Sequence, residues 1–169
     1  MTNPETSAAP LWARLTATFL GTGYMRPGPG SWGSAATVLV WWLIARYVLP
    51  GNLASGSQPY VCAGLALVAI AVGIPAATLV ARAAAKKDPQ FVVIDETAGQ
   101  LITLIGAPLT WQSLLVAFIL FRAFDIVKPP PIRMLERFPE GTGIVVDDVG
   151  AGLYALVVMQ VLLHFGVLR

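Results

Sequence analysis

Two pairs of adjacent acids are the residues of this chain best suited to chemistry. Asp95-Glu96 and Asp147-Asp148 each precede an apolar stretch. Hard divalent cations such as Mg²⁺ take oxygen ligands and leave positions open for substrate phosphate. A single acidic pair would more simply cap a helix and interact with its positive end. Two pairs on one face of a protein favour a metal, so we expect Asp95, Glu96, Asp147 and Asp148 to bind a divalent cation.

The two acidic pairs share a spacing to glycine. Gly99 follows Asp95 by four residues, and Gly152 follows Asp148 by four. Residues four apart share a helix face. We therefore expect each acid to lie beside a bare patch of helix that another helix or a ligand can approach.

A basic segment offers groups for phosphate. Arg122, Asp125 and Lys128 are spaced by three, which places them along one helix face before Pro129–Pro131. Arginine grips phosphate with a bidentate fork and lysine acts as a point charge. We expect Arg122 and Lys128 to be catalytic and to bind substrate, with Asp125 as a further metal ligand. A structural salt bridge between Arg122 and Asp125 is the alternative. Arg133 is a further substrate-binding candidate, or an anchor to anionic headgroups.

A glycine-rich loop, Gly21–Ser34, leads into an apolar helix. Glycines let backbone N–H groups approach an anion, and a helix N-terminus adds partial positive charge. Gly30, Ser31 and Ser34 are therefore candidates for substrate binding. The alternative is an entry loop in which Ser31 caps the helix.

Several phosphatase chemistries are excluded by the sequence. No D-x-D-x-T stretch is present, and Cys62 does not begin a C-x₅-R loop. His164 is the single histidine and lies near the outer end of the last predicted span, far from the acidic loops, which argues against a phosphohistidine intermediate. The dense acidic repeat of the CDP-alcohol phosphotransferases is also missing. Metal-assisted attack by water is the phosphatase mechanism that remains consistent with the sequence.

The composition predicts an integral membrane protein. Of the 169 residues, 56% are hydrophobic and 12% are charged, and the mean hydropathy is +0.71. Soluble domains carry about 25% charged residues. Ionisable side chains in such a chain are costly and tend to remain where they line a polar cavity or do chemistry. We expect one domain, residues 1–169, with residues 1–14 as a flexible N-terminal tail and no cleavable signal peptide. The net charge of +2 is too small to indicate a nucleic-acid partner.

Three segments are long and apolar enough to cross a bilayer, which takes about 20 residues. They are Trp32–Leu49, Tyr60–Ala81 and Val149–Leu168. Pro75 predicts a kink in the second of them. Between the first two, Pro50–Pro59 has the composition of a loop.

The stretch from Ile94 to Val127 has two interpretations. Gly99–Phe121 could be one span, which would separate the acids from Arg122. Alternatively Gly106–Pro108 breaks the run into a helical hairpin, because proline ends or kinks a helix. The hairpin would be re-entrant, or its short first arm would start within the membrane. Only the hairpin puts both basic segments in the cytoplasm, as the positive-inside rule requires. The expected fold is therefore all-α: a polytopic membrane helical bundle with three full spans and a proline-broken hairpin.

Four segments, taken in order, resemble the phosphatidylglycerophosphatase A family. They are PGPGSWGS (27–34), VIDETAG (93–99), FRAFDIVKPPPI (121–132) and GTGIVVDDVGAG (141–152). The resemblance runs from about Leu15 to Leu162. It departs at Met25–Gly28, where this chain adds a basic residue and an extra glycine.

The resemblance implies an Mg²⁺-dependent phosphatase that removes the phosphate monoester of phosphatidylglycerophosphate. It further implies a multi-pass protein of the bacterial cytoplasmic (inner) membrane, with its active site on the cytoplasmic side and a phospholipid substrate in the bilayer. A phosphatase for another lipid phosphate monoester, or a small transporter, stays open as an alternative. The sequence sets no oligomeric state.

Overall fold

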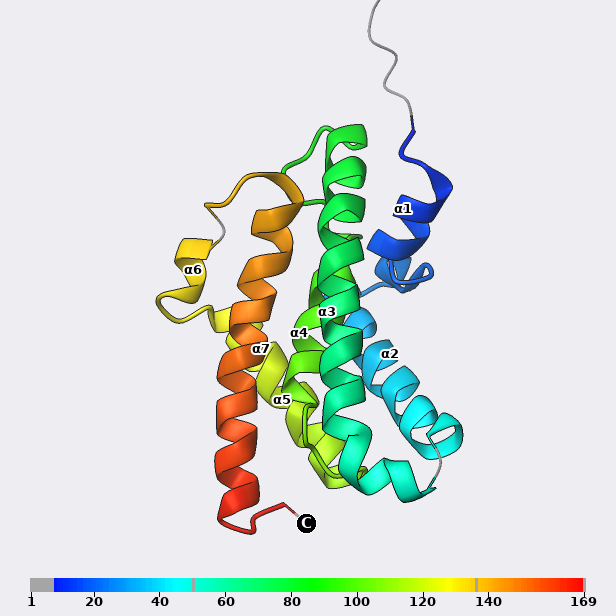
Figure 1. Ribbon diagram of the computed structural model, residues 1–169. Helices are drawn as coiled ribbons and strands as arrows, with labels where there is room; N and C mark the ends of the chain where they lie inside the picture. Colours follow the sequence, from blue (N-terminus) through cyan, green and yellow to red (C-terminus); the bar gives the residue numbers. More distant parts are fainter. Residues whose placement is uncertain (1–7, 50, 136, 169) are drawn as a thin grey trace, which may run out of the picture.

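The computed structural model describes residues 8–49, 51–135 and 137–168, without the side chains of residues 51–55. All regular structure in these residues is helical, which confirms the predicted all-α class. The elements in chain order are α1 (Leu11–Ala17), η1 (Thr22–Tyr24), α2 (Pro29–Leu43), η2 (Ile44–Val48), α3 (Gly51–Ala83), α4 (Ile94–Thr103), α5 (Trp111–Val127), α6 (Ile132–Leu135) and α7 (Glu140–His164) (Figure 1).

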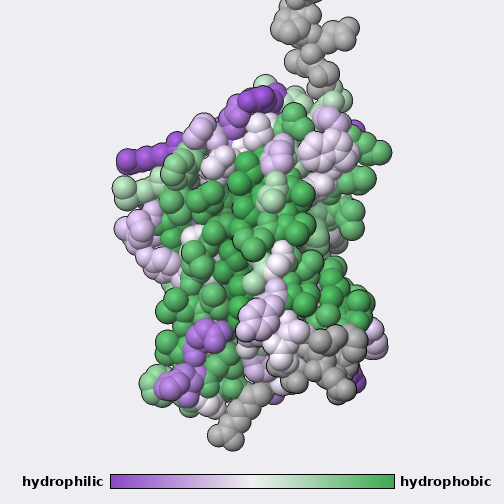
Figure 2. All heavy atoms as spheres, in the orientation of Figure 1, coloured by the Kyte–Doolittle hydropathy of each residue, from purple (hydrophilic) through white to green (hydrophobic). Residues whose placement is uncertain are grey.

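In the part of the chain that the structure describes, two helices are long and apolar enough to cross a membrane. They comprise the 28 residues Gly56–Ala83 of α3 and the 25 residues Glu140–His164 of α7. Figure 1 shows them side by side, and Figure 2 shows a broad hydrophobic band across the middle of the face in view. Where α3 ends and α7 begins, Arg82 binds the Glu140 carboxylate through two nitrogens, at 2.6 and 2.8 Å.

The first predicted span, Trp32–Leu49, is not confirmed as a full α-helical span. α2 covers 15 residues, and the chain then continues as the π-helix η2. The loop predicted for Pro50–Pro59 is wrong over residues 51–59, because α3 begins at Gly51 and includes Pro59 and Pro75. Glycine, serine and proline predict a loop from local preference alone, which tertiary packing can override.

α7 begins earlier than the sequence indicated, so Asp147-Asp148 lies about two turns inside the helix rather than before it. The glycine-rich segment at its start is helical because it docks against α3. A Cβ on Gly141 would come within 2.6 Å of Thr78 N, and Gly141 N donates to Thr78 Oγ1 at 3.1 Å. Gly141 thus allows the two helices to approach closely.

The predicted helical hairpin is present as α4 and α5. Gly106 adopts a left-handed φ of 75° at the turn, and the Thr110 hydroxyl caps α5 by accepting from Ser113 N. Gln160, one turn before the end of α7, donates to Ile105 O at 2.9 Å. The turn of the hairpin therefore lies beside the C-terminal end of α7.

α4 is the central helix of the bundle. Its residues from Thr97 to Thr103 are all buried, and it contacts α2, α3, α5 and α7. A Cβ on Gly99 would come within 2.9 Å of Phe121 Cζ in α5 and 2.5 Å of Asp148 O in α7. Both helices therefore pack closely against this turn of α4. Thr103 Oγ1 donates to Gly99 O at 3.0 Å and contacts Gly152 O at 3.4 Å. This tight contact confirms that Gly99 and Gly152 are approached by neighbouring helices.

α1 lies on the outside of the bundle but is attached to it. Ala13 and Ala17 are fully buried, and Ala17 O accepts from Val93 N at 2.7 Å, just before α4. The expected flexible tail of residues 1–14 is therefore wrong for residues 11–14, which are helical. Residues 1–7 lie outside the described residues.

Candidate active site

Three carboxylates from two helices meet in the interior of the bundle. Asp95 and Glu96 lie in the first turn of α4, and Asp148 comes from α7. One oxygen of each lies within 4.8 Å of the others. Asp95 and Asp148 are more than fifty residues apart in the sequence, so the fold brings them together. The close contact between Gly99 of α4 and Gly152 of α7 lies one turn further along both helices.

The cluster has the donors and the burial that a divalent cation requires. Asp95 is 8% exposed and Asp148 is 3% exposed. Asp95 Oδ1 and Glu96 Oε2 are buried without a hydrogen-bond partner. Buried carboxylates without partners are unfavourable unless a cation compensates them. Three oxygen donors with open positions suit Mg²⁺, so the residues present fit the predicted metal.

Asp147 takes a different partner from Asp148. Its Oδ2 accepts from Lys128 Nζ at 2.5 Å, in a largely buried ion pair. Lys128 adopts a left-handed φ of 45° at the C-terminal cap of α5, before the prolines. Asp147 lies outside the group of three acids, so its assignment as a metal ligand stays a prediction.

Arg122 lies between two carboxylates. Its Nη1 is 2.5 Å from Asp125 Oδ2 and 3.7 Å from Glu96 Oε1, and all three side chains are mostly buried. The predicted salt bridge between Arg122 and Asp125 is therefore present. Because Arg122 also approaches Glu96, it places a guanidinium at the edge of the acidic cluster, where a phosphate could be held.

The glycine-rich loop contributes Gly30 to the same place. A Cβ at Gly30 would overlap the Glu96 carboxylate and come within 3.0 Å of Arg122 Nη1. The Ser34 hydroxyl is fully buried and donates to Gly30 O at 2.9 Å, so it supports this turn of α2. Among the residues that the structure describes, no hydrogen bond or ion pair joins Ser31 or Arg133 to the acidic cluster, and their roles stay predictions.

Two residues near the site were not predicted from the sequence. Gln100 follows Glu96 by one turn, is fully buried, and neither atom of its amide has a hydrogen-bond partner. Its spacing of four from Glu96 was a signal that could have found it. Asp88 lines a cavity of about 190 Å³ together with Lys128 and Asp147. Nothing in the local sequence around Asp88 indicates that contact.

Comparison with known proteins decides the family. The family model described as phosphatidylglycerophosphatase A matches residues 15–163. The chain belongs to the phosphatidylglycerophosphatase A family. Two relatives carry that name: one from Haemophilus influenzae, 33% identical over 86% of this chain and 85% of its own length, and one from Escherichia coli, 31% identical over 89% and 83%.

A third relative has a different name. The protein from Bacteroides thetaiotaomicron is 35% identical over 87% of this chain and 91% of its own length, and is called a "putative phosphatidylinositol-3-phosphatase". No solved structure matches the chain. The phosphatidylglycerophosphatase A family and its two named members indicate phosphatidylglycerophosphatase activity, as the sequence predicted.

Proposed function

We propose that this phosphatidylglycerophosphatase A family member is an Mg²⁺-dependent lipid phosphatase. It would hydrolyse the phosphate monoester of phosphatidylglycerophosphate to phosphatidylglycerol and phosphate. The observation that carries the proposal is the buried cluster of Asp95, Glu96 and Asp148 with Arg122 at its edge. The cluster supplies the donors for a cation, and the guanidinium supplies a cationic group for the phosphoryl oxygens.

In this proposal Asp95, Glu96 and Asp148 hold Mg²⁺, with Asp147 and Asp125 as further candidates. When bound, Mg²⁺ polarises a phosphate and lowers the pKa of water. Arg122 offsets the negative charge that develops on the phosphoryl oxygens in the transition state. Its ion pairs hold the guanidinium in place beforehand, and such preorganised groups stabilise transition-state charge most effectively. Gly30 lets Glu96 and Arg122 lie against the first turn of α2, because a Cβ there would overlap the Glu96 carboxylate. Its backbone is a candidate to contact a phosphate held beside Arg122.

Lys128 and Asp147 form the second half of the proposed machinery. Their ion pair lines the same cavity as Asp88. Asp147 also directly precedes Asp148 of the acidic cluster in the sequence. A lysine held at one position can bind a phosphate oxygen as a point charge. Asp147, held by Lys128, and Asp125, held by Arg122, are the carboxylates available to accept a proton from water.

We further propose that the chain is a multi-pass protein of the bacterial cytoplasmic membrane with its site on the cytoplasmic side. Besides α3 and α7, α2 and η2 together run from Pro29 to Val48, and 20 residues extend about 30 Å as a helix. Asp148 lies eight residues after Glu140, so the cluster is about 12 Å below the start of α7. In this proposal the first arm of the hairpin starts within the membrane and its turn lies on the outer side. The hydrogen bond from Gln160 to Ile105, which holds the turn beside the C-terminal end of α7, supports it.

The proposal is tested by phosphate release from purified protein in detergent micelles. Phosphatidylglycerophosphate, phosphatidylinositol 3-phosphate, phosphatidate and lysophosphatidate are supplied in turn, with Mg²⁺ or with EDTA. We expect release from phosphatidylglycerophosphate with Mg²⁺ and its loss in EDTA. Faster release from phosphatidylinositol 3-phosphate would favour the activity in the name of the Bacteroides relative, and full activity in EDTA would overturn the metal assignment.

A further inference from the structure

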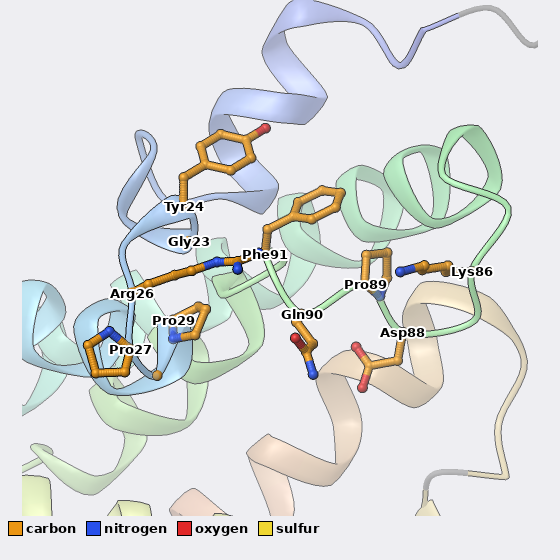
Figure 3. Close-up of a pocket in the computed structure, with 11 residues that line it drawn as sticks. Gly23, Tyr24, Arg26, Pro27, Pro29, Lys86, Asp88, Pro89, Gln90 and Phe91 are labelled. Atoms are coloured by element: carbon orange, nitrogen blue, oxygen red, sulfur yellow. The ribbon is translucent and has the colours of Figure 1, made fainter.

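A cavity separate from the acidic cluster opens between the turn after η1 and the loop after α3. It encloses about 580 Å³. Gly23–Pro29 form one wall and Lys86–Phe91 form the other, apart from Met25 and Lys87. Figure 3 shows Arg26 extending from the first wall toward Phe91, and Lys86 on the opposite wall pointing toward Pro89.

The side chains of this cavity favour an anion. Arg26 and Lys86 are both exposed, and neither makes an ion pair with another described residue. Asp88 is the one acid that lines the cavity. Arginine with a nearby lysine is a combination that binds phosphate oxygens, the arginine by its planar fork and the lysine as a point charge.

The cavity lies next to the acidic cluster. Gly28 and Pro29 line it, and Gly30 touches Glu96 and Arg122. Two Cα steps of about 3.8 Å separate Gly28 from Gly30 by no more than about 8 Å. Asp88 lines both this cavity and the smaller one beside Lys128 and Asp147. One small molecule with two phosphates could therefore contact the cavity and the cluster together.

The segment around Tyr24 has the character of a membrane interface. Tyr24 lines the cavity, is 57% exposed and stacks on Phe91 with ring centroids 5.6 Å apart. Nearby in the chain, Leu20 and Met25 are 78% and 44% exposed. Exposed tyrosine among apolar side chains is typical of the headgroup level of a bilayer. The phosphodiester of a phospholipid lies at that level.

We propose that this cavity binds the phosphodiester of the lipid substrate while the terminal phosphate monoester lies at the acidic cluster. The inference rests on the proposed function and deepens it: the preferred substrate class is a phospholipid whose headgroup carries a second phosphate beyond the diester. A three-carbon glycerol with a phosphate at each end suits the short path from Gly28 to Gly30. Arg26 and Lys86 then select the substrate by binding its phosphodiester. A lipid whose only phosphate is a monoester has no group for them to bind, so they do not raise its affinity.

The test compares Arg26→Ala and Lys86→Ala with Arg137→Ala, a control that removes an exposed cation outside the cavity. Loss of a charge-assisted hydrogen bond predicts a KM for phosphatidylglycerophosphate roughly tenfold higher or more in each cavity variant. We expect kcat to change little, as for binding equal in ground and transition states. The KM of phosphatidate, or its Ki as a competitor where it is not hydrolysed, should stay unchanged, as should every constant of the control. An equal rise for phosphatidate, or no rise for phosphatidylglycerophosphate, would overturn the assignment.

A second arm separates the lipid diester from free phosphate. If the cavity held only released phosphate, Arg26→Ala would weaken inhibition by inorganic phosphate and leave the KM of the lipid unchanged, which overturns the proposal. Titration calorimetry with glycerophosphoglycerol, a diester without monoester, needs no turnover. We expect its Kd to rise roughly tenfold in Arg26→Ala and to stay the same in Asp95→Asn. This arm decides the inference even where the wild-type protein hydrolyses none of the lipids, and no binding to the wild type would refute it.

Discussion

Gly152 of α7 lies directly on the backbone of Gly99 of α4, so closely that a Cβ on Gly152 would come within 2.9 Å of Gly99 Cα. In both helices an acid precedes the glycine by four residues, Asp95 in α4 and Asp148 in α7. The close helix contact therefore brings the two acids into one cluster. Packing of two bare helix faces sets the geometry of the site.

Gly152→Ala should destabilise the protein and reduce activity together. Overpacking of a tight contact costs about 1–3 kcal/mol, which equals or exceeds the gain of about 1 kcal/mol from replacing glycine within a helix. The control is Gly64→Ala in α3, where an added Cβ meets nothing within 4 Å. Thermal unfolding in detergent measures both variants. A Gly152→Ala protein as stable and active as Gly64→Ala would contradict the contact.

Asp148→Asn should remove the metal site while the fold is kept. Loss of one of three carboxylates in a buried cluster should lower Mg²⁺ affinity and hydrolysis at least about 100-fold, since even outer partners of a metal site contribute 10–100-fold. The experiment is binding of Mn²⁺, followed by electron paramagnetic resonance, beside phosphate release. Glu140→Gln, which removes an exposed acid of the same helix, should bind Mn²⁺ like the wild type. Equal binding in Asp148→Asn would exclude the three-acid site.

Asp147 and Lys128 should behave as one unit. Breaking a buried pair leaves an uncompensated charge, so Asp147→Asn and Lys128→Met should each destabilise the protein by roughly 3 kcal/mol. In a double-mutant cycle the combined variant should lose less than the sum of the two. Urea unfolding of the four proteins gives this coupling. If Asp147→Asn also abolished Mn²⁺ binding, Asp147 would be a metal ligand as the sequence predicted, and strict additivity would show that the ion pair contributes nothing.

Arg122→Lys should lower kcat about 100-fold or more, because a fixed donor to the transition state contributes about that much and lysine lacks the planar fork. Arg82→Lys is the matched control: Arg82 also pairs with a carboxylate, that of Glu140, but it is exposed and lies at the end of α3. Steady-state kinetics with phosphatidylglycerophosphate separate kcat from KM. A kcat as high as that of Arg82→Lys would show that Arg122 serves only to hold Asp125.

Cysteine labelling should place the two ends of the hairpin on opposite sides. In a Cys62→Ser background, which removes the single cysteine, Gln90→Cys should react only when the cytoplasmic side is accessible. Thr110→Cys, at the hairpin turn, should react from outside intact cells. Protection of Thr110→Cys from the outside reagent would instead fit a shallow re-entrant loop and contradict the depth that the Gln160–Ile105 contact implies.

The sequence predicted the parts of the site that depend on local rules. Pro108 and Gly106 indicated the break between α4 and α5, and the spacing of Asp95 to Gly99 indicated a bare helix face. The start of α7 at Glu140 depended on docking against Thr78, which no local pattern shows. The ion pair between Asp147 and Lys128 was likewise not predicted, and the assignment of Asp147 as a metal ligand stays a prediction.

The sequence predicted the hydrophobic surface of the bundle but not which acids are buried together, and the difference has a physical reason. Composition predicted a membrane protein, since so few residues are charged. Which charged residues meet is set by the crossing of α4, α5 and α7. The spacing of Gln100 to Glu96 could have indicated Gln100, whereas Asp88 lies in an ordinary sequence context and only the folded arrangement brings it to the site.

The shortness of α4 has a consequence for how a substrate would reach the acids. With 10 residues it extends only about 15 Å, about half the thickness of a bilayer. If the hairpin turn reaches the outer side as proposed, the first turn of α4 lies within the membrane. A lipid would have to lower its headgroup only slightly to meet the carboxylates and would keep both acyl chains among its neighbours. A water-soluble phosphate ester, which has no such tether, would have to give up most of its hydration to travel the same path. Selectivity for lipids would then follow from depth alone, before any side chain discriminates.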